Sequence, residues 1–218
     1  MSDLTHQENH PFLDFVKKYK KALINTLILT IVLIGGYFGY TELYQKPLEA
    51  KAADALFTAE KYFAVDSSNL VLNGDGTNKG ALYVIKTFGG TKAANLAKYY
   101  AGISYFRTGD FNKSIELLND FSTNAKQVQA IAYGTIGDAH AELKKNDEAV
   151  TYYKKAGGHF PEDEAISAEY LFRAASLLEL SGKTEEAVTI YKDIKAKYPK
   201  TEKGFMADKY IYRLQVQP

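Results

Sequence analysis

Two stretches share one spacing and decide the fold: residues 137–161 read GDAHAELKKNDEAVTYYKKAGGHFP, and residues 175–199 read ASLLELSGKTEEAVTIYKDIKAKYP. Ala149, Tyr153, Ala156 and Pro161 of the first recur 38 residues later as Ala187, Tyr191, Ile194 and Pro199. An earlier copy contains Gly102, which Gly137 matches 35 residues later. A period of this length is typical of stacked helical hairpins, in which each unit buries its apolar face against the next.

The residue types fit two helices packed closely together. Small residues at 102, 137 and 175 let the second helix of a hairpin approach the first, and Ser114, Ala149 and Ala187 do the same from the other side. We predict first helices over 93–108, 128–143 and 163–181, and second helices over 111–122, 146–157 and 184–197.

Glycine and proline mark the ends of these helices. Gly109 and Gly182 supply the left-handed backbone that ends a helix without a Cβ penalty. Lys144 takes that place in the middle copy, so the turn there is less clearly specified. Pro161 and Pro199 should close the second helices.

A degenerate unit over residues 41–91 precedes the three repeats of residues 92–200. Pro47 should start a helix over 48–65, with 80–88 as its partner. The segment 65–79 contains Asn-Gly and Asp-Gly turn signals and is too long for an ordinary repeat turn, so we expect an inserted loop. An EF-hand reading puts Val71 and Leu82 where acidic ligands belong, so we predict no metal site there.

An apolar run of 19 residues, ALINTLILTIVLIGGYFGY, occupies positions 22–40. As a helix it would rise about 28 Å, close to the hydrocarbon thickness of a bilayer. A cleaved signal peptide would end in a small-residue site, and the nearest, Ala50-Lys51-Ala52, lies ten residues beyond Tyr40. The run therefore predicts a single uncleaved transmembrane helix.

Four lysines within residues 17–21 precede this run, and only Lys46 and Lys51 follow it closely. The positive-inside rule then places residues 1–21 in the cytoplasm as a tail and the C-terminal part on the other side. In a bacterium with two membranes, this predicts an inner-membrane protein with a periplasmic domain. Gly35 and Gly39 form a Gly-x-x-x-Gly pair that would let a partner helix approach closely.

Composition narrows the function further. Residues 1–41 hold 4 of the 27 basic and 3 of the 26 acidic side chains, so 23 of each remain beyond them and that part carries no net charge. Such a balance gives no field to attract nucleic acid, and we expect no nucleic-acid partner. The chain has no cysteine, which excludes a lipoprotein anchor, disulfides and a thiol nucleophile.

Residues 92–199 resemble three tetratricopeptide repeats, and the layout of the whole chain resembles the YfgM-like family of ancillary Sec-translocon subunits. The most family-like stretch is GGTKAANLAKYYAGISYFRTGDFNKSIELL, which begins at Gly89. The resemblance implies a membrane-anchored, all-α protein whose repeat solenoid works with the Sec translocon and a membrane-anchored periplasmic chaperone on exported proteins.

Motifs for catalysis are missing from the sequence. It contains no Gly-x-Ser-x-Gly elbow, no phosphate-binding loop and no His-Glu-x-x-His pair, and its four histidines are scattered. We therefore expect no enzyme, no cofactor and no catalytic or metal-binding residues, and we keep a hydrolase or metal enzyme only as a remote alternative.

In a tetratricopeptide solenoid the first helices line a concave groove, and the repeat register projects a defined set of residues into it. The candidate partner-binding residues are Leu96, Tyr99, Ile103, Phe106, Arg107, Asp138 and Phe172. As an alternative, Tyr99 and Ile103 pack under the degenerate unit.

The C-terminal segment 201–218 should contain an amphipathic helix, about 201–215, that caps the last repeat. The sequence as a whole thus predicts a single-pass membrane protein with a protein-binding repeat domain. A second interpretation of the same class is an envelope or cell-division scaffold, although such proteins usually carry a coiled coil and no heptad run is present.

Overall fold

The computed structural model describes residues 11–216, and every element within them is helical. The chain divides into two units, one ending at Leu48 and one beginning at Glu49. Each is described by itself.

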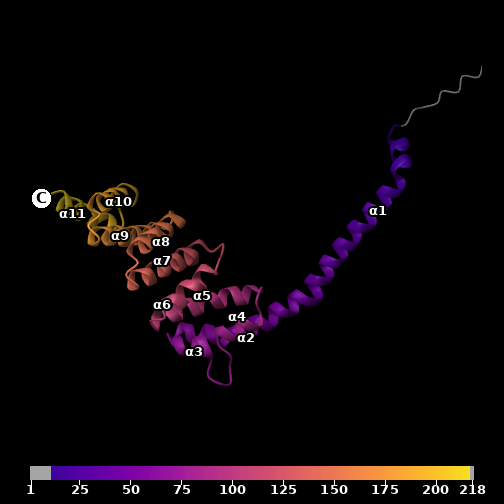
Figure 1. The fold of residues 1–218 in the computed structure, drawn as a ribbon, viewed down its shortest axis with the longest axis horizontal. Coiled ribbons are helices and arrows are strands. Elements are labelled where there is room, and N and C mark those ends of the chain that lie inside the picture. The colour runs from indigo at the N-terminus through magenta and orange to yellow at the C-terminus, as the bar shows by residue number, and fades with distance from the viewer. Residues whose placement is uncertain (1–10, 217–218) are drawn as a thin grey trace, which may run out of the picture. The chain divides into compact units, whose positions relative to one another are not determined.

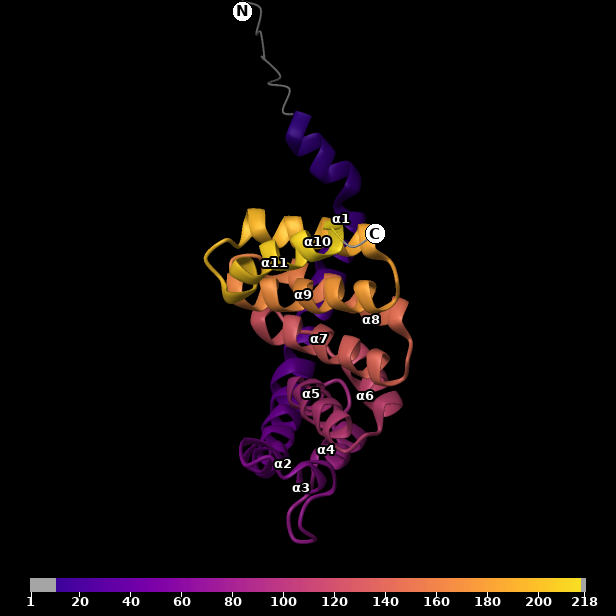
Figure 2. The same cartoon turned by 90° about the vertical axis from the view of Figure 1, so that its left-hand side faces the viewer.

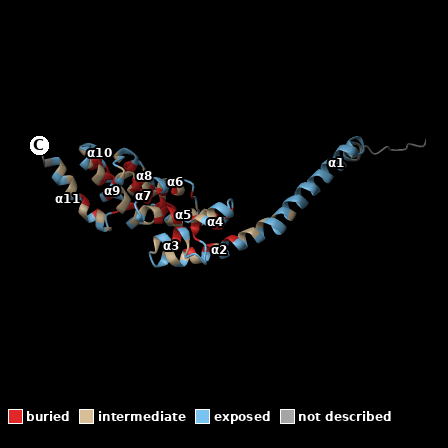
Figure 3. Cartoon of the chain, turned by 60° about the horizontal axis from the view of Figure 1, so that its bottom comes forward, coloured by how far each residue is buried: buried red, intermediate tan, exposed pale blue. Residues whose placement is uncertain are grey.

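The first unit contains helix α1 (Pro11–Tyr40), the π-helical turn η1 (Thr41–Gln45) and the start of α2 (Lys46–Ala64). Apolar side chains of α1 are largely exposed, with Leu33 64% and Leu27 60% accessible (Figure 3). Phe15–Ala64 is one helical stretch that is long and apolar enough to cross a membrane, by length and composition alone. This makes it a weak candidate for a transmembrane span.

Helix α2 covers the predicted range 48–65 to within one residue at its end and has Pro47 in its first turn. It continues from η1 without a break, however, so Pro47 does not begin the helix. The Lys46 amide bonds to the Thr41 carbonyl, five residues earlier, which is the π-helical pattern. Proline has no amide hydrogen to donate at position 47, so a widened turn beside it lets the helix run on.

The second unit is a stack of helical hairpins (Figures 1 and 2). The three predicted pairs appear as α5 (Lys92–Arg107) with α6 (Phe111–Asn119), α7 (Lys126–Glu142) with α8 (Asn146–His159), and α9 (Glu164–Leu180) with α10 (Thr184–Lys197). Helix α11 (Glu202–Val216) follows the last pair. The predicted pairing of helices is confirmed.

Close helix packing occurs at the predicted small residues. A Cβ added to Gly102 would lie 2.6 Å from Leu118 Cγ, and one added to Gly137 would lie 2.7 Å from Tyr153 Cδ1. Ala149, Ala175 and Ala187 are fully buried. The repeat register read from the sequence is therefore the one that the helices use.

The turns also follow the sequence. Gly109 and Gly182 are left-handed, with φ of 84° and 76°. Lys144 adopts the same conformation, with φ of 61°, although it carries a Cβ. All three repeats therefore turn alike, including the one whose turn the sequence left open.

Helix α6 ends at Asn119, three residues before the predicted end. Phe121 then turns into the core, where it is 4% exposed. The Asn95 side chain pairs with the Ser122 backbone, donating to its carbonyl at 2.8 Å and accepting from its amide at 3.3 Å. These contacts fix the irregular segment that follows Asn119.

The degenerate unit consists of α2, α3 (Ser68–Asn73) and α4 (Ala81–Thr87). Helix α3 corrects the prediction that 65–79 is a loop throughout, since Val71 is fully buried and Leu72 is 4% exposed. The insertion begins with a tight turn at residues 65–66 and ends with a longer one, closed by an antiparallel bridge between Gly74 and Lys79. Burial of an apolar Leu-Val-Leu run outweighed the turn signals beside it.

Buried side chains form three clusters in the second unit. The first joins α2, α3, α4 and α5, the second joins α5, α6 and α7, and the third joins α8 to α11. Each cluster lies between neighbouring hairpins, which is how repeat solenoids bury their core.

Candidate functional site

The predicted groove residues of α5 fall into a buried and an accessible group. Ile103 is 8% exposed and belongs to the core cluster with Leu118, Phe121 and Ile136. A partner could not reach Ile103 without repacking this cluster. We therefore withdraw it from the candidate surface.

Tyr99 lies between the degenerate unit and the first repeat. Its ring centroid is 6.3 Å from that of Phe63 on α2 and 5.2 Å from that of Phe121. Burial raises the pKa of the Tyr99 hydroxyl. The ring thus packs under the preceding unit, as the alternative interpretation held, while part of it remains accessible.

Phe106 and Arg107 lie at the C-terminal end of α5. The Phe106 ring packs against Phe111, at 5.7 Å between centroids. Arg107 Nη1 is 2.8 Å from Asp66 Oδ1, and its guanidinium lies 4.9 Å from the centre of the Phe63 ring. With 39% of its side chain exposed, Arg107 remains accessible although it already has partners.

Asp138 on α7 is the centre of a polar network. One of its oxygens, Oδ1, accepts hydrogen bonds from the Tyr153 hydroxyl and from Arg173 Nη1, each at 2.8 Å. Arg173 Nε also donates to Glu169 at 2.9 Å. Burial, together with the charge of Asp138, raises the pKa of Tyr153. Asp138 thus ties α7, α8 and α9 together.

Tyr170 fills the space over Gly134 on the same face. A Cβ on Gly134 would lie 2.0 Å from Tyr170 Cε1, so only glycine accommodates the ring there. Burial raises the pKa of Tyr170 to about 12. The middle of the predicted groove is therefore occupied by the protein's own side chains.

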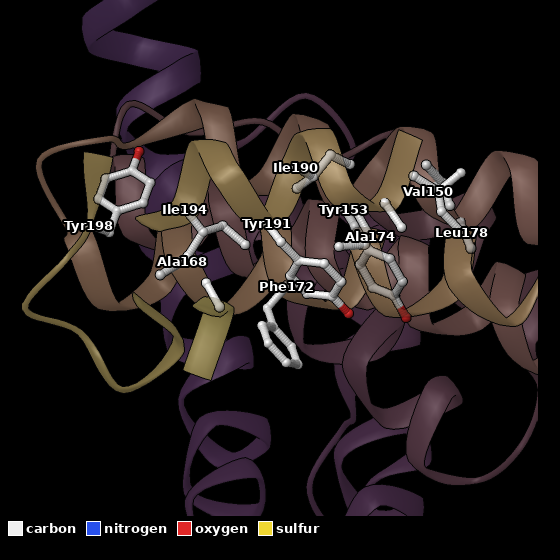
Figure 4. Packing of buried hydrophobic residues seen from close by; sticks show 14 residues of the cluster. Val150, Tyr153, Ala168, Phe172, Ala174, Leu178, Ile190, Tyr191, Ile194 and Tyr198 are labelled. Carbon is white, nitrogen blue, oxygen red and sulfur yellow. The ribbon is translucent and has the colours of Figure 1, made fainter. Parts of the chain in front are cut away.

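Phe172 is 9% exposed, and its ring lies beside that of Tyr191 in the core of the last repeat (Figure 4). It makes edge-on contacts with Tyr191 at 5.2 Å and with Tyr210 of α11 at 4.9 Å. The expectation that Phe172 extends an open surface is therefore corrected. Helix α11 packs on the last repeat, in the way expected of a cap.

A hollow of about 990 Å³ lies between α2 and α5. Small and apolar residues line part of it, and charged residues line the rest. The lining consists of Glu49, Ala50, Ala53, Asp54, Leu56, Phe57, Glu60, Lys92, Ala93 and Leu96. We call this the α2–α5 groove. A neighbouring hollow of about 620 Å³ shares Lys92 and Leu96 with it.

Glu49 fixes the two helices that form this groove. Its two carboxylate oxygens accept hydrogen bonds from the Lys92 amide, each at 3.0 Å. A carboxylate is stabilised at a helix N-terminus because the first amide groups have no partner within the helix. These hydrogen bonds therefore hold the N-terminus of α5 against α2 at one end of the groove.

Sequence reasoning found only Leu96 among the groove residues. Positions 50, 53, 57 and 60 of α2 have spacings of three, four and three, which puts them on one helical face. That spacing is the sequence signal from which the groove could have been predicted.

In the first unit, a Cβ added to Gly35 or Gly39 would meet no atom within 4 Å in the described chain. The contact of these glycines with a partner helix stays a prediction.

Comparisons with known proteins agree with this geometry. Models of the tetratricopeptide repeat family match residues 130–156 and 169–201. The solved structures include a match to a single-site variant of nearly identical TPR-like repeats of a candidate kinesin light chain from Podosopora anserina. That match has a TM-score of 0.55 and 12% identity, and covers 76% of this chain and 85% of the other. A search of curated proteins found no match.

The second unit is thus an all-α solenoid of tetratricopeptide-like repeats. Such domains generally mediate binding to protein partners, and the fold is typically a non-enzymatic interaction scaffold. The likeness to the fungal repeats, at this identity, concerns the fold alone.

Proposed function

We propose that this protein is a single-pass, membrane-anchored module that binds other proteins through its repeat solenoid. One observation carries the proposal: an exposed apolar helix precedes a solenoid of protein-binding repeats. In water, the side chains of Leu27, Val32 and Leu33, each at least 60% exposed, would be unfavourably solvated. A bilayer would cover them.

The proposed location is a bacterial inner membrane, with the N-terminus in the cytoplasm and the solenoid in the periplasm. Its support is the lysine cluster at 17–21 before the apolar run. The proposed partners are the Sec translocon and a membrane-anchored periplasmic chaperone, acting on exported proteins. They rest on the resemblance of the chain to the YfgM-like family.

Reporter fusions test the orientation. Alkaline phosphatase fused after Pro218 should be active, and a cytoplasmic reporter at the same point should be inactive. An active cytoplasmic reporter there would contradict the orientation.

Co-purification of the full chain in mild detergent tests the partner class. Replacing Phe106 and Arg107 together with Ala should reduce partner capture, because aromatic and arginine side chains are enriched at interfaces, and truncation at an interface hot spot costs about 2 kcal/mol or more. The matched control replaces Phe205 and Lys209, an exposed aromatic and cation on α11, with Ala. Circular dichroism checks that the helices persist. Equal capture by both folded variants would show that the α5 end does not bind the partner.

A further inference from the structure

We propose that the α2–α5 groove binds an amphipathic helix of a partner protein, one with large apolar residues on one face and Lys or Arg beside them. This deepens the proposed function and rests on it. The groove is open, whereas Tyr170 fills the space over Gly134 in the middle repeat and α11 covers Phe172 in the last one.

The floor of the groove fits large apolar side chains. Ala50, Ala53 and Ala93 have small side chains, so they leave the space between α2 and α5 unfilled. Leu56 and Leu96 lie in the lining beside them. A Leu or Phe from a partner would fill this space and exclude water from it.

Phe57 gives the groove an apolar wall. Its side chain is 54% exposed, although Leu56 beside it is buried. Lys61 Nζ lies 4.3 Å from the centre of the Phe57 ring, and this lysine is not among the groove residues. Burial of the exposed part of the ring by a partner would be favourable.

The length of the groove fits a helix. Groove residues of α2 run from Glu49 to Glu60, which spans about 16 Å at the helical rise of about 1.5 Å per residue. That is about three turns of a bound helix, enough to place anchors at positions i, i+3 or i+4, and i+7.

The charges at the rim decide the sign of the partner. The lining contains three carboxylates, those of Glu49, Asp54 and Glu60, and one amino group, that of Lys92, so the lining has an excess of two negative charges. Glu49 is already bound to the N-terminus of α5. Among the ion pairs of the described residues, none involves Asp54 or Glu60.

The Tyr100 hydroxyl lies near one of these carboxylates. Burial raises its pKa, and the charge of Glu60 raises it further. The neutral hydroxyl can donate a hydrogen bond to Glu60 but brings no positive charge, so the rim keeps its excess of negative charge. It therefore favours a basic partner and disfavours an acidic one.

The test uses the full chain in nanodiscs of zwitterionic lipid and a short fluorescent helical peptide of leucine and lysine. A second, otherwise identical peptide carries glutamate in place of lysine. Asp54→Lys with Glu60→Lys should weaken binding of the lysine peptide about tenfold and strengthen binding of the glutamate peptide. The matched control, Glu116→Lys with Glu186→Lys, makes the same change of charge at exposed positions on α6 and α10.

A second pair of variants separates groove filling from charge. Ala53→Phe puts a ring into the groove at an exposed position, so the fold should persist while peptide binding is lost. Ala196→Phe adds the same ring to an exposed position on α10 and should leave binding unchanged.

Equal peptide affinity in wild type, Ala53→Phe and the Asp54 and Glu60 variant would overturn the proposal. So would equal losses in the groove variants and their controls. Co-purification of the cellular partner by the same groove variants shows which claim has failed. If capture persists while peptide binding is lost or absent, the solenoid binds its partner elsewhere; if even wild type captures nothing, the proposed function fails as well.

Discussion

Replacement of Gly102 with Leu tests the packing of the first clear repeat. The Cβ of any side chain at this position would lie 2.6 Å from Leu118 Cγ and 2.8 Å from its Cδ2, well inside van der Waals contact. Leu118 is fully buried, so it cannot turn into solvent to make room. Overpacking of this kind typically costs about 1 to 3 kcal/mol.

Helix propensity offsets part of that cost, because leucine is favoured over glycine in a helix by up to about 1 kcal/mol. Because two atoms of a fully buried neighbour clash, the cost should lie in the upper part of that range, about 2 to 3 kcal/mol, and the expected net loss is then roughly 1 to 2 kcal/mol. For a domain of this size, that corresponds to a fall in Tm of about 2 to 8 °C. The assay is thermal melting of the full chain in detergent, with circular dichroism as the signal that reports the loss of helix.

Two further variants make the result specific. Gly158→Leu has the same gain in propensity on α8, but its Cβ meets no atom within 4 Å, so its Tm should not fall. Leu118→Ala combined with Gly102→Leu removes the clashing atoms, so the double variant should lose less than the sum of the two single losses. Wild-type Tm in Gly102→Leu, or strict additivity in the double variant, would refute the register.

Three other predictions concern the remaining features of the chain. Replacing Gly35 and Gly39 with Ile should weaken co-purification of membrane partners while insertion is retained, and unchanged co-purification would mean that the glycines only face lipid. Burial lowers the pKa of His140 in the folded chain. The unfolded chain, in which this pKa is about 6.5, therefore binds more protons, so the free energy of unfolding should fall as the pH drops below about 6.5. Melts from about pH 8 to about pH 5 should show a smaller fall in the His140→Phe variant. Asp75 accepts hydrogen bonds from the Tyr62 hydroxyl at 2.7 Å and from turn amides, so Asp75→Ala should speed hydrogen exchange at 74–79 with little change in Tm, whereas unchanged exchange would show that the turn does not depend on it.

The sequence predicted the repeats well because local rules and packing agree there. Gly109 and Gly182 can adopt left-handed backbone without strain, and the small residues at 102 and 137 have one obvious use in paired helices. Lys144 shows the limit of such reasoning. The same turn forms there without glycine, closed by the Lys145 amide donating to the His140 carbonyl at 2.9 Å.

Other features depend on contacts that the sequence does not display. Helix α3 is stabilised by burial of Val71 and Leu72 against other helices. The sequence does not show this burial, and the turn residues around α3 therefore pointed to a loop. Which groove positions are open was equally hidden. Phe172 occupies a groove position by register, but α11 covers it, and that cover becomes visible only in three dimensions.

Site-specific photocrosslinking in cells tests most directly whether the solenoid binds proteins at the α2–α5 groove. A photoreactive phenylalanine analogue is placed at Phe57 in the α2–α5 groove or at Phe205 on α11, which are exposed by 54% and 73%. We expect position 57 to crosslink to a basic amphipathic segment of a membrane or periplasmic protein, identified by sequencing the crosslinked peptide, and to lose the crosslink in the Ala53→Phe variant. A crosslink of equal yield from position 205, or no protein crosslink from position 57, would contradict the account.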